Sequence, residues 1–156
     1  MSSPPVVSNS SPLIALDGIG ELNLLEKLFT DIVIPPAVTR ETASSKGLPG
    51  WIREMALGQA IGAQVLSASL GAGESEAICL ALELNARWVL LDDRPARRLA
   101  QSLNLPVIGT LGVLLTCKRR GLIQAIKPLV DGLVRFGFRV SPSLYQRVIK
   151  AAGEGP

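Results

Sequence analysis

Short apolar runs alternate along the chain with longer segments whose apolar residues recur every three to four positions. The runs predict strands at 6–8, 31–34, 87–91 and 106–108, with weaker candidates at 61–66 and 138–140. The longer segments predict helices at 12–16, 21–29, 36–41, 51–60, 74–85, 94–103, 110–120, 123–134 and 142–152. Because strands alternate with helices, we expect an α/β fold with a mostly parallel sheet covered on both faces.

The length of 156 residues predicts one domain over 1–156. No apolar run is long enough to cross a membrane, and residues 1–5 lack the basic and apolar regions of a signal peptide. Cys79 and Cys117 each lie in an apolar helical segment, which favours buried free thiols over a disulfide. We therefore expect a cytoplasmic protein.

The distribution of charge is uneven. Positions 1–93 hold 5 Lys and Arg against 11 Asp and Glu, whereas positions 94–156 hold 11 against 2. This asymmetry suits a cation site beside a polyanion-binding face, although interleaved helices could equally mix the two signs in space. Histidine is absent, which excludes Ser-His-Asp and Cys-His nucleophilic sites and His-ligated zinc. Hydrolytic chemistry would therefore rest on carboxylates.

The stretch Leu91-Asp92-Asp93-Arg94 carries the clearest chemical signal. Two carboxylates follow a predicted buried strand, at the end where parallel sheets open into a ligand crevice. Acidic oxygens there can hold a hard divalent cation. Asp93 could equally cap the following helix, whereas Asp92 has no such local role in the sequence.

Other candidates have structural alternatives. Glu74 and Glu76 lie in a first helical turn, where the helix dipole alone favours acids. Glu41 could be a solvated side chain, and Asn9 could be a turn residue. The basic residues could bind phosphate or cap helix ends; they are Arg94, Arg97, Arg98, Lys118, Arg119 and Arg120. Six aromatic residues give little support to base stacking, and no phosphate-cradling glycine loop is evident.

A series of short motifs is similar to one family. In order, the motifs are Asn9-Ser10-Ser11-Pro12-Leu13-Ile14, Pro35 to Glu41, Gly73-Glu74-Ser75-Glu76-Ala77-Ile78, Leu91 to Arg94 and Val107 to Gly112. Together they resemble the PIN-domain superfamily, in a prokaryotic branch similar to VapC-type toxin ribonucleases. The resemblance covers about 6–123, which makes 124–152 a helical extension of a PIN-like core.

The resemblance implies a three-layer α/β/α sandwich and a ribonuclease site that depends on Mg²⁺ or Mn²⁺. The acidic ligands of the family correspond here to Asn9, Glu41, Glu74 and Asp93, with Asp92 as neighbour. Ser11 corresponds to the hydroxyl that supports the first ligand. Position 9 is Asn where active members have Asp, so the first ligand brings an oxygen but no charge.

The leading hypothesis is therefore a metal-dependent endoribonuclease in which Ser11, Arg94, Arg97 and Lys118 to Arg120 position the RNA. A toxin role would further imply a small antitoxin partner and a homodimer. The first alternative is a PIN-like module that binds RNA or protein without cleaving, which Asn9 favours. The second is a small domain that binds a phosphorylated metabolite.

Overall fold

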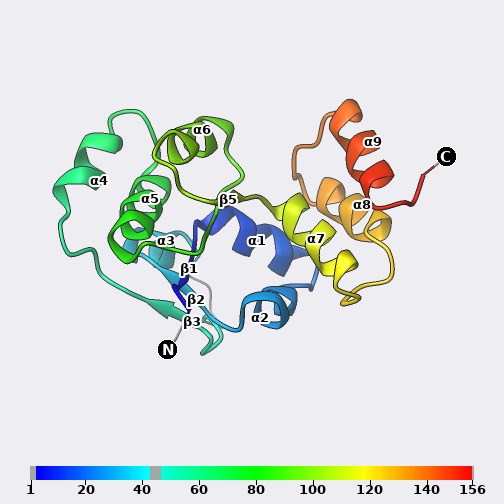
Figure 1. The fold of residues 1–156 in the computed structure, drawn as a ribbon, viewed down its shortest axis with the longest axis horizontal. Coiled ribbons are helices and arrows are strands. Elements are labelled where there is room, and N and C mark those ends of the chain that lie inside the picture. The colour runs from blue at the N-terminus through cyan, green and yellow to red at the C-terminus, as the bar shows by residue number, and fades with distance from the viewer. Residues whose placement is uncertain (1–2, 43–46, 156) are drawn as a thin grey trace.

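The computed structural model describes residues 3–42 and 47–155 around a five-stranded sheet (Figure 1). Its strands are β1 (Val6–Ser8), β2 (Ile32–Ile34), β3 (Ile52–Glu54), β4 (Trp88–Leu90) and β5 (Val107–Ile108). All neighbouring strands are parallel, in the order β3-β2-β1-β4-β5. The strand order reverses between β1 and β4, and their carboxyl ends mark the point where such sheets bind ligands.

Helices connect the strands and cover both faces of the sheet. They are α1 (Ser10–Gly18), α2 (Asn23–Phe29), α3 (Pro36–Glu41), α4 (Ile61–Leu66), α5 (Ala72–Leu84), α6 (Arg94–Ser102), α7 (Thr110–Arg119), α8 (Lys127–Arg135) and α9 (Pro142–Ala151). In Figure 1, α8 and α9 lie beyond α7, at the end of the molecule remote from α4 and α5. No helix in the described ranges is both long and apolar enough to cross a membrane.

Alternation along the strands builds two apolar layers. Val6 and Leu90 belong to a core shared with α1, α2, α7, α8 and α9, whereas Val7 and Val89 belong to a core shared with α5 and α6. Successive strand side chains point to opposite faces, so both faces of a parallel sheet can be buried. The expected three-layer α/β/α sandwich is confirmed.

Several local predictions are wrong. Residues 51–60 do not form a helix, because Ile52 pairs with Ile32 and β3 becomes the edge strand beyond β2. Residues 61–66 form α4 instead of a strand, with Ala63 as the buried residue and an exposed Ile61 and Val65. Residues 138–140 form no strand, and α1 begins at Ser10, one residue before the predicted cap Ser11. Tertiary pairing has overridden local propensity at these sites.

Candidate functional site

Asn9 lies at the carboxyl end of β1, directly at the switch point. Its backbone N–H donates to the carbonyl of Leu90 at 3.0 Å, which ties the end of β1 to β4. The residue is only 4% exposed, and its Oδ1 atom has no hydrogen-bond donor within the described ranges. A buried carbonyl oxygen without a donor is unusual in a folded protein, and a bound cation could satisfy it.

Glu41 ends α3 and reaches the same point from the other side. Its Oε1 accepts a hydrogen bond from Ser10 Oγ at 2.9 Å. Gly73, buried near the start of α5, faces both groups: a Cβ there would overlap the Glu41 carboxylate and lie 3.0 Å from Asn9 Oδ1. The missing side chain at position 73 therefore lets Asn9 and Glu41 approach the first turn of α5.

Glu74 follows Gly73 and lies beside the end of β4. Its Oε1 accepts a hydrogen bond from the backbone N–H of Gly71 at 3.2 Å. Burial raises the pKa of Glu74; the Gly71 hydrogen bond lowers it, and the nearby carboxylates of Asp93 and Glu41 raise it further. The like-charged neighbours place all three carboxylates in one electrostatic group.

Asp93 is the N-cap of α6, as its position before a proline predicts. Its Oδ2 accepts from the backbone N–H of Ala96 at 3.2 Å. This hydrogen bond engages a single carboxylate oxygen. Asp93 can therefore serve as a cap through one oxygen, and its carboxylate is close enough to Glu74 to raise the pKa of Glu74.

Asp92 has a structural role that the local sequence does not show. It receives two hydrogen bonds from Thr110, at the start of α7, and a longer one of 3.5 Å from Ser11 Oγ. Burial raises the pKa of Asp92, and the hydrogen bonds from Thr110 and the charge of Arg97 oppose that rise. Asp92 therefore caps a helix that begins 18 residues later.

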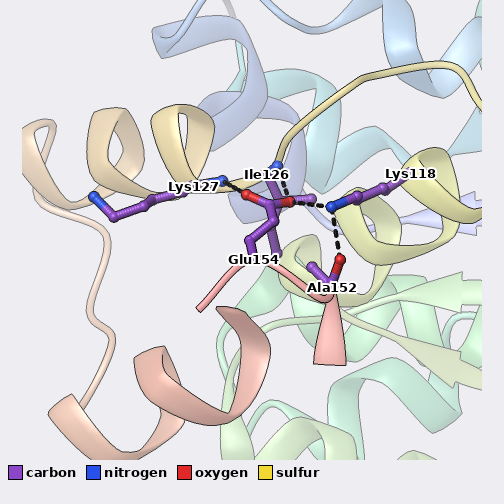
Figure 2. Close-up of polar contacts among 5 residues, drawn as sticks. All are labelled: Lys118, Ile126, Lys127, Ala152 and Glu154. Atoms are coloured by element: carbon purple, nitrogen blue, oxygen red, sulfur yellow. Dashed lines mark hydrogen bonds and ion pairs between the residues drawn. The ribbon is translucent and has the colours of Figure 1, made fainter. Parts of the chain in front are cut away.

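The predicted basic residues divide into two groups. Arg94 is exposed beside the acidic edge, and Arg97 donates to the carbonyl of Leu91 at 3.2 Å. The cluster Lys118 to Arg120 is not brought to this edge, because it lies at the far end of α7, roughly 13 Å away by helix rise. Lys118 Nζ instead donates to the carbonyl of Ala152 at 2.6 Å and to Glu154 at 2.7 Å (Figure 2).

The acidic residues fit a divalent cation in kind, although they are not closed into a ligand cluster. Within 3–42 and 47–155, no three Asp, Glu, Cys or His side chains lie close enough together to hold an ion as they stand. Glu41, Glu74 and Asp93 each direct one oxygen to a protein donor instead. Asn9 Oδ1, which has no partner among the described residues, and the Glu41 carboxylate both lie against Gly73, and this is where oxygen ligands could converge.

A parallel sheet between helical layers, with acids at its switch point, defines this chain as an α/β protein with a carboxylate site. A family model described as PIN domain matches residues 5–154. The chain therefore belongs to the PIN-domain family, which has a nuclease-type fold. The match extends past the core of about 6–123 and includes α8 and α9. No curated protein matches the chain, and no solved structure matches it.

Three contributors to the site escape prediction from the sequence. Ser10 holds Glu41, Thr110 holds Asp92, and Gly73 leaves room for both Asn9 and Glu41. Ser10 and Gly73 adjoin predicted ligands in the sequence, so a small residue beside a predicted ligand could have indicated their role. Thr110 has no such signal, because its partner comes from a different strand.

Proposed function

We propose that this PIN domain is a metal-dependent endoribonuclease. The observation that supports the proposal most is the buried Oδ1 of Asn9 beside Glu41 at the switch point, which has no donor among the residues that the structure describes. Asn9, Glu41, Glu74 and Asp93 would hold Mg²⁺ or Mn²⁺, and Asp92 would keep the neighbouring helix in place. Such an ion supplies Lewis-acid chemistry, neutralises phosphoryl charge and acidifies a water molecule.

The residues of the chain would contribute position and proton control. Burial raises the pKa of Glu74, and the neighbouring carboxylates of Asp93 and Glu41 raise it further, which favours Glu74 as the residue that exchanges a proton with a water molecule. In the hydrolysis, a water oxygen bonds to phosphorus, one ester P–O bond breaks and the departing oxygen gains a proton. The proposed contacts to the RNA backbone at this edge are Ser11, Arg94 and Arg97, with Arg94 the best placed. The cluster Lys118 to Arg120 lies at the far end of α7, so it would contact only a part of the RNA remote from the carboxylates.

The direct test is Mn²⁺ titration by calorimetry followed by RNA cleavage in the same buffers. Asp93→Asn is the informative variant, because Asn caps a helix as well as Asp does and leaves the fold intact. Asp31→Asn, at the amino end of β2 and on the opposite edge, is the matched control. We expect Mn²⁺ binding and cleavage in the wild type and the control, and loss of both in Asp93→Asn. Absence of both in the wild type would reject the nuclease.

One observation favours a second candidate, a module that binds RNA or protein without cleaving. Position 9 is a neutral amide, and each nearby carboxylate is already held by a protein donor.

If the protein is a toxin, the resemblance leads us to propose a small antitoxin partner and a homodimer. Light scattering with and without the product of the neighbouring gene would test both. The two free, buried cysteines support a cytoplasmic location.

A further inference from the structure

A groove of about 590 Å³ opens beside the acidic edge. One wall comes from α6 and the start of α7, and the other comes from α9 and the segment before it. Four arginines line the groove: Arg94, Arg97, Arg139 and Arg147. Among the described residues that line the groove, the one carboxylate is Asp92, which accepts hydrogen bonds from Thr110. We refer to this feature as the arginine groove.

The charges of the arginine groove are not neutralised from within. Arg94, Arg139 and Arg147 are exposed, and none of the four arginines has a carboxylate within ion-pair distance among the described residues. Clustered cations of this kind, placed in a concave surface, produce a strong local positive potential. The groove is therefore suited to a polyanion.

The segment Arg135-Phe136-Gly137-Phe138-Arg139 holds two aromatic rings between two cations. Phe138 and Arg139 line the arginine groove, whereas Phe136 lines a neighbouring hollow. Phe136 is 72% exposed, whereas Phe138 is partly buried against the core. Gly137 lies between the two rings and has a φ of +95°, a backbone conformation that residues with a side chain rarely adopt. The chain turns at this glycine, so that one ring is exposed and the other is partly buried. An exposed ring between arginines can stack on an unpaired base.

Phe138 connects the arginine groove to the end of β1. It also lines a neighbouring hollow of about 420 Å³ together with Phe136, Ser10 and Ser11. Ser10 is the residue that holds Glu41. A linear polyanion bound along the arginine groove would therefore extend toward the carboxylates.

The elements that carry these side chains are firmly placed. Tyr145 on α9 donates to Asp131 on α8 at 2.6 Å, and Ser141 caps the first turn of α9 through the N–H of Leu144. Glu154 accepts from the N–H groups of Ile126 and Lys127, which holds the start of α8 (Figure 2). The groove is therefore preorganised, which lowers the entropic cost of binding.

We infer that the arginine groove binds single-stranded RNA, with phosphates at Arg94, Arg139 and Arg147 and a base on Phe136. The inference rests on the proposed function for its substrate class, but binding requires neither metal nor cleavage. The exposed ring favours RNA over an acidic polypeptide, because a base offers a stacking face beside each phosphate. It also favours a single strand, because duplex bases are already stacked.

The test is fluorescence anisotropy with a labelled single strand of about 12 nucleotides, in EDTA, at several salt concentrations. The main variant is Arg139→Ala combined with Arg147→Ala. Arg87→Ala is the matched control, since Arg87 is an exposed arginine at the amino end of β4, on the opposite edge. We expect the double variant to bind at least about tenfold more weakly and to lose about 1.4 units of salt slope. The control should match the wild type.

The ring is tested with Phe136→Ala and Phe136→Tyr. We expect Phe136→Ala to weaken single-strand binding without changing the salt slope, and Phe136→Tyr to restore it. Thermal melting establishes that each variant is folded, and all of these side chains are exposed.

Three outcomes would overturn the inference: no single-strand binding by the wild type, equal binding by the double variant, or preferred binding of polyglutamate through the same arginines. Failure of the nuclease gives a different result. If the wild type binds RNA through Arg139 and Arg147 but does not cleave it with Mn²⁺, the RNA-binding inference is supported and the proposed nuclease activity is rejected. If the wild type cleaves RNA but does not bind it through these arginines, only the RNA-binding role of the groove is rejected.

Discussion

The carboxylate of Asp92 accepts two hydrogen bonds from Thr110, one from its backbone N–H at 2.7 Å and one from its hydroxyl at 2.6 Å. This pair joins the end of β4 to the start of α7. It assigns the two adjacent aspartates different tasks, because Asp92 faces α7 whereas Asp93 caps its own helix. The distinction leads to the first prediction.

Asp92→Ala should destabilise the protein by about 1–3 kcal/mol, because it uncaps α7 and leaves a buried N–H without an acceptor. Asp92→Asn should cost less, since its amide oxygen can still accept from Thr110. Urea unfolding measures both values. A change below about 0.5 kcal/mol in Asp92→Ala would show that the Thr110 contacts contribute little.

Asn9→Asp should have opposite effects with and without metal. In EDTA, the new buried carboxylate beside Glu41 should lower the free energy of unfolding by about 1–3 kcal/mol. With Mn²⁺ present, the added charge should strengthen metal binding and restore stability. Thermal melts in both buffers, with RNA cleavage, test this directly. Equal destabilisation in both buffers would contradict a cation site at Asn9, and a gain of cleavage would identify the wild type as a weakened enzyme.

Gly73→Ala should disable the site while leaving the fold nearly unchanged. The new methyl group would displace the Glu41 carboxylate, which is the flexible end of an exposed side chain. Alanine also favours a helix over glycine by about 1 kcal/mol, which offsets part of the strain. Calorimetry should therefore show loss of Mn²⁺ binding with a melting temperature close to that of the wild type. Retained binding would mean that Glu41 is not a ligand.

Mn²⁺ affinity should increase with pH. Burial, with Asp93 and Glu41 nearby, raises the pKa of Glu74 above 4.5. A proton on Glu74 competes with the metal, so affinity should rise by up to about tenfold per pH unit below the raised pKa and level off above it. Glu74→Gln should remove this part of the pH dependence. An unchanged profile in Glu74→Gln would assign the titration to another group.

Glu154→Ala should lower the free energy of unfolding by about 1–3 kcal/mol, since Lys118 and two N–H groups at the start of α8 lose their acceptor. Lys118→Met leaves the N–H contacts in place and should cost less. Urea unfolding compares the two. Equal stability of Glu154→Ala and the wild type would contradict a structural role for this contact.

The sequence predicted the strands β1, β2, β4 and β5 and most of the helices, because their apolar periodicity is strong and local. It missed β3 and α4. Ile52 is the one buried residue of β3, so a two-residue alternation is hardly visible there. In α4, Ile61 and Val65 favour a strand by propensity, yet both are exposed and the segment packs through Ala63. Packing against other elements determined both outcomes.

The candidate site was predictable where a residue adjoins its own element. Asp93 before Pro95 indicated a cap, and Asn9 and Asp92 followed buried strands. The partners Thr110 of Asp92 and Ser10 of Glu41 lie 18 and 31 positions away, and only the tertiary fold brings them together. The same holds for the arginine groove. Arg139 and Arg147 lie in the basic half of the chain, but no local pattern places them beside Asp92.

The position of Glu154 in the chain has a consequence for the order of biosynthesis. The residues of the candidate metal site are synthesised well before Glu154, which fixes the start of α8. These residues are Asn9, Glu41, Glu74 and Asp93. A nascent chain therefore presents its carboxylates before the wall that carries Arg139 and Arg147 is held in place.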